Sequence, residues 1–270
     1  YKRVIVPEKN LLDMSKGYNI FSISSIPDIN EVIETLYNIY VEKINRSDYK
    51  EKLKKKKYLV NLLEEVDYKK HPKINNFILN DLFTKSAAKY FKNIPIIASA
   101  QLWLSINNNT KEGSQKWHKD NEDKKQIKFF IPIRDIEIDM GPTCFIDKIK
   151  SKAILKSIEH ETLTGQIGTS LKKSDLGKKR VGDLTGRIPD QLINENEIIK
   201  GTIKKHDGLA LDTASCLHMG SRTTGTSKHR IVLMIQFLPP NSHGESSYGY
   251  PPIQLNNEID SELNKLIIDK

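Results

Sequence analysis

Apolar residues recur at helical spacing in the first third of the chain. Residues 29–44 follow a Pro27-Asp28 start signal, and residues 76–91 end before Asn93 and Pro95. The stretch between them, residues 49–68, carries a lysine run broken by apolar positions. Such a run is usually the hydrated side of a helix or loop. The pattern predicts a mainly helical region over residues 1–95.

The pattern changes at Pro95 to short apolar or alternating runs separated by Gly, Asn, Asp and Ser. Such runs predict β-strands. We expect them at residues 96–106, 126–133, 144–146, 209–212 and 230–238. Many short strands with turn residues between them favour an antiparallel sandwich or jelly roll. The predicted class is therefore α+β, with a helical region at residues 1–95 packed on a β core at residues 96–270, together forming one structural domain.

Two further segments have a weaker pattern. Residues 157–199 alternate glycines with basic residues and predict a long connection, in which residues 166–187 are either an active-site lid or a loop without substrate contact. Residues 258–268 predict a short terminal helix.

Composition restricts the classes of protein that fit. With 37% hydrophobic residues the chain can form a real core, and no run of eighteen apolar residues predicts a membrane span. The formal net charge of +9 favours anionic partners. The lysines are scattered, however, without the basic and aromatic stripe of nucleic-acid binders, so we expect no nucleic-acid partner. Only Cys144 and Cys216 are present, and no apolar segment follows the basic start, which favours a reducing, cytoplasmic setting.

The candidate chemistry centres on His118, Asp120 and His218. On an extended segment, residues two apart point to the same side, so His118 and Asp120 could reach one ion. Two imidazoles and one carboxylate suit ferrous iron and leave coordination positions open. Arg230 heads the strongest predicted strand, and its guanidinium could hold a carboxylate through two hydrogen bonds. Arg222 and Arg134 compete for that role.

Other residues near these positions have less specific patterns. Trp103 and Trp117 are either pocket or core residues, and Cys216 is expected to be a packed thiol rather than a ligand. The other histidines are predicted to be surface groups: His71, His160, His206, His229 and His243.

The order of the motifs resembles a known family. Trp117-His118-Lys119-Asp120 is followed by residues 129–132, by Gly141-Pro142-Thr143, by residues 207–212, by His218-Met219-Gly220 and by His229-Arg230. This order is similar to that of the phytanoyl-CoA dioxygenase-like branch of the iron- and 2-oxoglutarate-dependent oxygenases, over residues 95–240. The chain departs from the family pattern at two places: Lys119 lies where the family often has a glutamine, and Asp207-Gly208 lies where it usually has Gly-Asp.

The resemblance implies a cupin-like double-stranded β-helix, or jelly roll. It implies Fe(II) bound by His118, Asp120 and His218, with 2-oxoglutarate anchored by Arg230 and further contacts from Gln101 and Thr143. The implied reaction uses O2 and releases succinate and CO2. Related halogenases lack the carboxylate ligand, so Asp120 favours hydroxylation of a small or carrier-linked metabolite, including anionic ones.

Two other functions fit the same residues. One is a metal-binding jelly roll without oxygenase activity, such as a cupin-like isomerase or binding module, which would have no need of Arg230 as an anchor. The other is a basic polyanion-binding protein, which would need no iron and would bind with a steep salt dependence.

Overall fold

The computed structural model describes residues 11–55, 58–106, 110–163, 188–224, 229–240 and 242. A six-stranded antiparallel sheet forms its centre, in the order β1-β7-β4-β9-β3-β2, and a three-stranded sheet has the order β6-β5-β8. The large sheet consists of β1 (Tyr18–Ser22), β7 (Asp207–Leu211), β4 (Ile127–Pro132), β9 (Arg230–Leu238), β3 (Ile96–Ser105) and β2 (Val60–Asn61). The small sheet consists of β6 (Ile199–Gly201), β5 (Thr143–Phe145) and β8 (His218–Met219).

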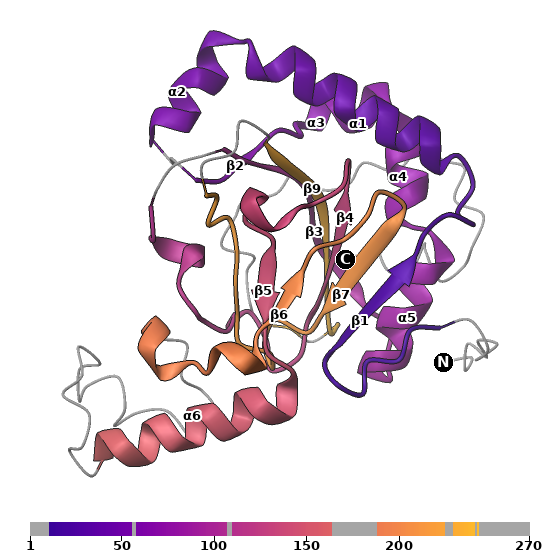
Figure 1. The fold of residues 1–270 in the computed structure, drawn as a ribbon. Helices are drawn as coiled ribbons and strands as arrows, with labels where there is room; N and C mark the ends of the chain where they lie inside the picture. Colours follow the sequence, from indigo (N-terminus) through magenta and orange to yellow (C-terminus); the bar gives the residue numbers. More distant parts are fainter. Residues whose placement is uncertain are drawn as a thin grey trace.

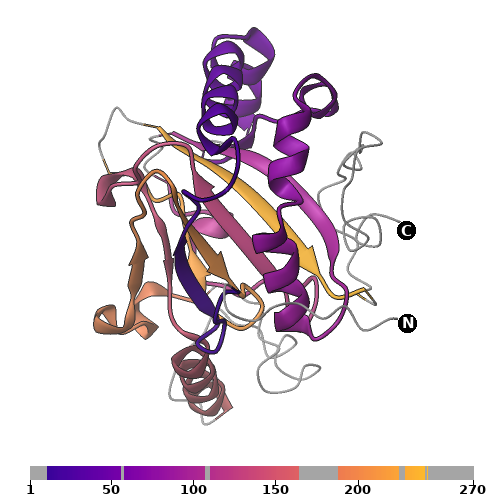
Figure 2. The ribbon, with the colours of Figure 1, turned by 90° about the vertical axis from the view of Figure 1, so that its right-hand side faces the viewer.

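Helices of the N-terminal region cover one side of the large sheet, and the small sheet lies on the other side, where the later helix α6 packs against it (Figures 1 and 2). The helices are α1 (Ile29–Ile44), α2 (Ser47–Lys55), α3 (Glu65–Lys70), α4 (Pro72–Ile78), α5 (Asp81–Phe91) and α6 (Lys148–Leu163). Short 3-10 turns lie at Gly113–Gln115, Ile138–Met140, Asp190–Leu192 and Glu195–Glu197. The predicted α+β jelly-roll architecture is confirmed.

Strand β9 explains how the two faces differ. Residues one apart on a strand point to opposite sides. Ile231, Leu233, Ile235 and Phe237 belong to the core cluster that includes residues of α1, α4 and α5. Arg230, Val232, Met234 and Gln236 instead line a cavity. One strand thus supplies the hydrophobic core with one set of side chains and the cavity with the other.

The five predicted strands are all present within one or two residues of the expected bounds. The helical N-terminal region was only partly right, since residues 18–22 and 60–61 are strands β1 and β2 that pair with β7 and β3. The helix expected at residues 76–91 is divided into α4 and α5, because Asn80 caps α5 by accepting a hydrogen bond from Leu82 N.

Part of the connection expected at residues 157–199 belongs to regular elements, since α6 extends to Leu163 and strand β6 begins at Ile199. The proposed lid at residues 166–187 and the terminal helix at residues 258–268 lie outside the described residues. In the part of the chain that the structure describes, no helix is both long and apolar enough to cross a membrane.

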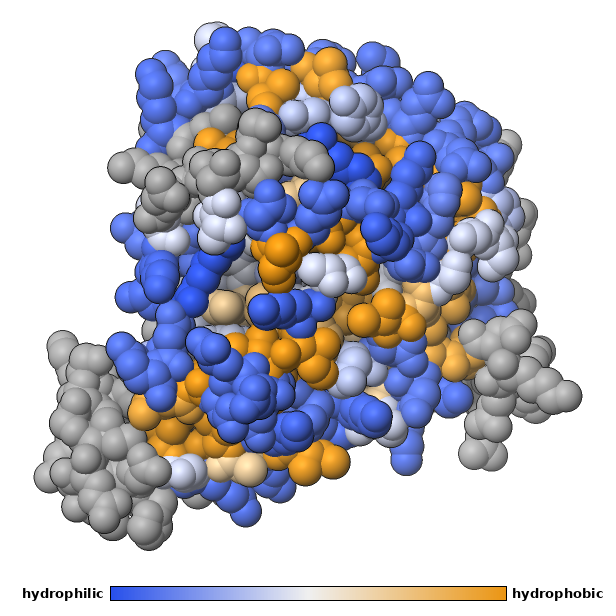
Figure 3. Space-filling view, in the orientation of Figure 1, coloured by the Kyte–Doolittle hydropathy of each residue, from blue (hydrophilic) through white to orange (hydrophobic). Residues whose placement is uncertain are grey.

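The face drawn in Figure 3 is largely hydrophilic among the described residues, and its apolar residues come to the surface in separate patches. This agrees with the scattered lysines of the sequence.

Candidate metal centre

A reciprocal pair of backbone hydrogen bonds joins His118 to His218. His118 N donates to His218 O at 3.0 Å, and His218 N donates to His118 O at 2.9 Å. This is the hydrogen-bonded pairing of two antiparallel strands. It holds two residues a hundred positions apart in the chain directly opposite each other, so their side chains emerge side by side.

Asp120 is placed by the loop that follows β7. Its backbone N–H donates to Thr213 O at 2.9 Å. The neighbouring Asp212 is fully buried and organises this loop, because it accepts hydrogen bonds from the Tyr90 hydroxyl and from the N–H groups of Ala214 and Ser215. A helix of the N-terminal region therefore helps to fix the third residue of the site.

The three side chains present one potential ligand atom each, all within 4.8 Å of one another. Nε2 of His118 lies 3.6 Å from Asp120 Oδ1, and Nε2 of His218 lies 3.6 Å from Asp120 Oδ2. Two atoms that each bind one ion at about 2.1 Å are separated by roughly 3–3.5 Å. The two imidazole–carboxylate distances exceed this separation by only a few tenths of an ångström, so the cluster is close to the size that one metal ion requires.

The tautomers of both imidazoles are fixed by the backbone. His118 Nδ1 lies 2.7 Å from Lys116 O, and His218 Nδ1 lies 3.1 Å from Cys216 O. A carbonyl oxygen can only accept, so each Nδ1 carries its proton and donates it. Each Nε2 then presents a lone pair toward Asp120, which is the orientation that metal-binding histidines need.

Lys128 on β4 shares the Asp120 carboxylate with the two imidazoles. Its Nζ donates to Asp120 Oδ2 at 2.7 Å. Burial alone would raise the pKa of Asp120, but the charge of Lys128, to which the two imidazoles add when they are protonated, outweighs burial and holds this pKa well below its usual range. Asp120 is therefore an ionised carboxylate, as a metal ligand must be.

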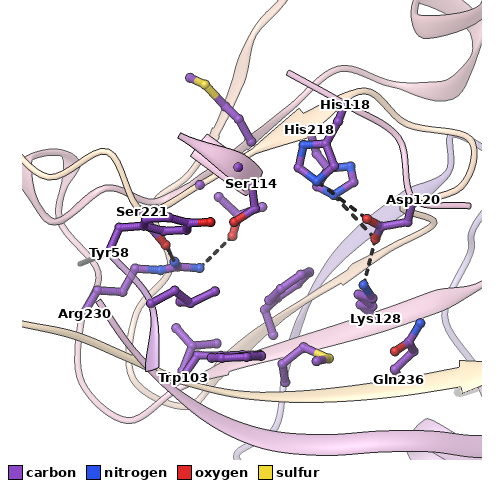
Figure 4. Close-up of a pocket in the computed structure, with 18 residues that line it drawn as sticks. Tyr58, Trp103, Ser114, His118, Asp120, Lys128, His218, Ser221, Arg230 and Gln236 are labelled. Carbon is purple, nitrogen blue, oxygen red and sulfur yellow. Dashed lines mark hydrogen bonds and ion pairs between the residues drawn. The ribbon is translucent and has the colours of Figure 1, made fainter. Parts of the chain in front are cut away.

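Arg230 lies across the same cavity from the three candidate ligands (Figure 4). Arg230 is 5% exposed, and burial lowers the pKa of its guanidinium to about 10. It donates to Ser221 Oγ at 3.1 Å and to Thr143 Oγ1 at 2.8 Å, while its Nε has no hydrogen-bond partner. No Asp or Glu of the described residues forms an ion pair with it. A buried cation without a counter-ion is costly, and an anion in the cavity would relieve that cost.

A tight crossing of two loops places the hydroxyl groups around Arg230. Gly141 has φ +67°, and a Cβ there would lie 2.7 Å from Arg222 N. The close approach lets Ser221 N donate to Gly141 O at 3.1 Å. Thr143 follows two residues later, so both hydroxyls meet at the guanidinium. The backbone conformation and the close approach of Arg222 therefore explain why the first residue of the Gly141-Pro142-Thr143 motif is glycine.

The two competing arginines have other partners. Arg222 forms a two-pronged ion pair with Asp190, with both distances 2.8 Å, and Arg134 donates to the backbone oxygen of His229. Neither arginine lines the cavity, so of these three candidates Arg230 is the one that presents a guanidinium to it.

The remaining candidates fall into two groups. Thr143 and Trp103 line the cavity, whereas Trp117 is 1% exposed and packs in a core cluster with Leu217 and Ile188. Gln101 is buried opposite Met234, and its Oε1 has no hydrogen-bond partner. It does not contact Arg230, whose partner on β3 is Ser105, and its contact with a co-substrate stays a prediction.

Cys216 is a packed thiol as expected. It is fully buried, and its Sγ donates to Gly17 O at 3.5 Å. His229 is not the surface group that the sequence predicted, because it is half-buried and its Nδ1 lies 3.0 Å from the Tyr40 hydroxyl. His71 and His206 are partly exposed, and the surroundings of His160 and His243 are outside the described residues.

Sequence reasoning missed several cavity residues, among them Lys128, Ser221 and Tyr58. The alternation on β4 carried a signal for Lys128, since it has the same parity as Phe130 and the opposite parity from core residue Phe129. Ser221 and Tyr58 lie outside regular strands, and no periodicity marks them.

No family model matches the sequence, and no curated protein is similar to it. The branch named from the motifs therefore stays a prediction. Solved structures do share the fold. One is HygX from Streptomyces hygroscopicus with nickel and 2-oxoglutarate bound, at TM-score 0.52 and 10% identity, covering 84% of this chain and 85% of that chain. Another is AviO1 from Streptomyces viridochromogenes Tue57, at TM-score 0.51 and 11% identity, covering 84% of this chain and 91% of that chain.

The likeness spans most of each chain at very low identity, so it establishes a shared architecture. The fold class is the cupin-like jelly roll of these structures.

Proposed function

We propose that the protein is an Fe(II)- and 2-oxoglutarate-dependent oxygenase that hydroxylates a small or carrier-linked metabolite. One observation carries the proposal: a His-Asp-His cluster and a buried guanidinium without a counter-ion lie in the same cavity. The first fits a divalent metal and the second fits a carboxylate. A dicarboxylic acid that binds the metal at one end and an arginine at the other satisfies both.

The residues divide the task as follows. His118, Asp120 and His218 would hold the iron, and Arg230 with the Ser221 and Thr143 hydroxyls would hold the distal carboxylate of 2-oxoglutarate. When bound, iron and 2-oxoglutarate supply the oxidising chemistry, in which decarboxylation to succinate and CO2 accompanies transfer of one oxygen atom from O2 to the substrate. The likeness to HygX, whose structure holds nickel and 2-oxoglutarate, supports this assignment.

The cavity favours an uncharged substrate portion beside the metal. Of its two cations, Arg230 faces the place assigned to the co-substrate and Lys128 is paired with Asp120. Much of the remaining wall is apolar or aromatic: Leu59, Trp103, Phe130, Met219, Val232 and Met234. Such a wall binds and orients apolar groups and excludes water from the reacting centre. An anionic group of the substrate would then lie away from this part of the cavity.

The competing functions predict different behaviour. A metal-binding jelly roll without oxygenase activity has no use for a buried, uncompensated Arg230. A polyanion-binding protein would gather its cations on a surface, and it would bind its partner without metal.

Purified protein should bind Fe(II) and 2-oxoglutarate anaerobically with a weak visible charge-transfer band. Exposure to O2 should release succinate slowly even without substrate. His218→Ala should lose both signals, and Arg222→Met should retain them as a matched control. Full metal binding by His218→Ala would refute the ligand assignment, and metal binding without any succinate release would favour the non-oxygenase alternative.

A further inference from the structure

Lys128 is an ammonium group inside the cavity, bonded to the carboxylate that the proposed function assigns to iron. Its Nζ lies 2.7 Å from Asp120 Oδ2 and 4.0 Å from Glu122 Oε1, and its side chain is 12% exposed. In Figure 4 it lies directly below Asp120, on the opposite side of that carboxylate from the two imidazoles. The carboxylate thus already has a cation beside it.

The backbone of β4 holds Lys128 in this place. Lys128 pairs with Leu211 of β7 on one side and with Gln236 of β9 on the other, so it lies in the middle of the large sheet. A lysine at the rim of a protein can turn its charge into water, but a lysine on a central strand has little room to do so. Its charge is therefore a permanent part of the cavity.

The same ammonium group is near a second buried carboxylate. Glu122 has an 11% exposed side chain, and its Oε2 has no hydrogen-bond partner. Two buried carboxylates close together are unfavourable unless a cation accompanies them. In the part of the chain that the structure describes, Lys128 is the lysine or arginine that forms ion pairs with both.

We propose that Lys128 is a built-in counter-ion for Asp120. Its charge keeps the three ligand residues together in the absence of metal, and it lowers the affinity of these residues for a metal ion. The inference rests on the proposed metal site. Lys128 is in this sense a positioning residue, since it acts on the metal through Asp120.

The physical reason is competition between two cations for one carboxylate. A divalent ion bound by Asp120 would lie on the order of 4 Å from the ammonium group, where repulsion in a partly desolvated cavity is strong and little screened by salt. The hydrogen bond from Lys128 also withdraws charge from the oxygen atoms that would bind the ion. Removal of the ammonium charge therefore strengthens metal binding, whereas damage to the site would weaken it.

The test measures Mn(II) binding without 2-oxoglutarate, at fixed pH, by the loss of the free Mn(II) signal in electron paramagnetic resonance. Lys128→Met and Lys128→Gln should bind Mn(II) at least about tenfold more tightly than the wild type. Lys128→Arg keeps the charge and should stay within about threefold. Lys204→Met removes an exposed lysine, paired with Asp135, and should leave the affinity unchanged.

Thermal unfolding gives a second readout that a merely structural role would not produce. Metal-free Lys128→Met should melt below the wild type, and saturating Mn(II) should raise its melting temperature by more than it raises that of the wild type. If Lys128→Met is not recovered folded, Lys128→Gln decides the question.

Equal or weaker Mn(II) binding by a folded Lys128→Gln or Lys128→Met would overturn the inference. A different result concerns the proposed function: wild-type protein that binds no Mn(II), or binds it equally well after His218→Ala, would have no metal site of this kind. The two failures are therefore distinguishable.

Discussion

Replacement of Arg230 by methionine separates two effects of this residue: its effect on the stability of the free protein and its effect on the binding of an anion. Methionine has a similar length and no charge. Burial lowers the pKa of Arg230 from its ordinary value to about 10, which corresponds to a cost of about 3 kcal/mol for keeping the charged form in the fold. Because the pKa is lower in the fold than in the unfolded chain, this cost is complete at neutral pH and is relieved only as the pH rises past about 10.

The substitution removes that cost together with two hydrogen bonds, to Ser221 and Thr143. Hydrogen bonds of a charged group contribute about 1.5–3 kcal/mol each. The two effects partly cancel, so we expect the free energy of unfolding to fall by no more than about 3 kcal/mol. In a domain of this size that moves the melting temperature by at most roughly 12 °C.

Binding of 2-oxoglutarate should respond far more strongly. Loss of one partner of a buried charge pair costs about 2–5 kcal/mol, which weakens binding by about thirtyfold or more. Isothermal titration of the Mn(II)-loaded protein with 2-oxoglutarate, beside thermal unfolding of the free protein, measures both quantities. Arg222→Met is the control, since it removes the ion pair with Asp190 and the hydrogen bond to Gln115 O, neither of which involves Arg230, and it should leave the affinity for 2-oxoglutarate unchanged.

The opposite result would refute the reasoning. If Arg230→Met unfolded easily and its folded fraction bound 2-oxoglutarate as the wild type does, Arg230 would be a structural residue. The anion would then bind elsewhere in the cavity.

Four further predictions concern the ligands, the anchor, the loop and the thiols. His118→Ala should bind Mn(II) at least about a hundredfold more weakly with little change in melting temperature, and near-normal binding in the same titration would exclude His118 as a ligand. Thr143→Val removes one hydrogen bond to Arg230 and should weaken 2-oxoglutarate binding by about fivefold or more; an unchanged isotherm would remove Thr143 from the anchor. Tyr90→Phe removes the hydroxyl that donates to Asp212 and should lower the melting temperature by several degrees, whereas a stability equal to that of the wild type would show that the loop holds Asp120 without it. Burial raises the pKa of both Cys144 and Cys216, so iodoacetamide at pH 8 should modify neither thiol in the folded protein; rapid modification seen by mass spectrometry would contradict their burial.

Five strands of the β core could be predicted because each carries its own pattern, whereas β6 and β8, of three and two residues, were not predicted. Residues 230–238 are β-branched and apolar and end at a Pro-Pro pair, which defines β9 without knowledge of its neighbours. Strands β1 and β2 have no such pattern, being short and mixed, and they form because β7 and β3 offer edges for pairing. Helix α6 was missed because its lysines and those of the following segment gave no clear period.

In the candidate site, too, some residues could be predicted from the local sequence and others depend on the tertiary fold. His118, Asp120 and His218 could be proposed from residue type and order, and Arg230 from its place at the head of a strand. Thr143 was named from the family resemblance, but its meeting with Ser221 at Arg230 depends on the crossing of two loops at Gly141, which no local pattern reveals. Lys128 required the knowledge that its side of β4 faces the cavity and not water.

The reciprocal backbone bonds between His118 and His218 have a consequence for the newly made chain. The two imidazoles become neighbours only after the segments around residues 118 and 218 have found each other, which is a contact of long range in sequence. An incomplete or misfolded chain thus lacks the pair. If iron is the natural metal, its capture waits for a finished protein, and polypeptide that is still exposed does not hold a redox-active ion next to its own oxidisable side chains.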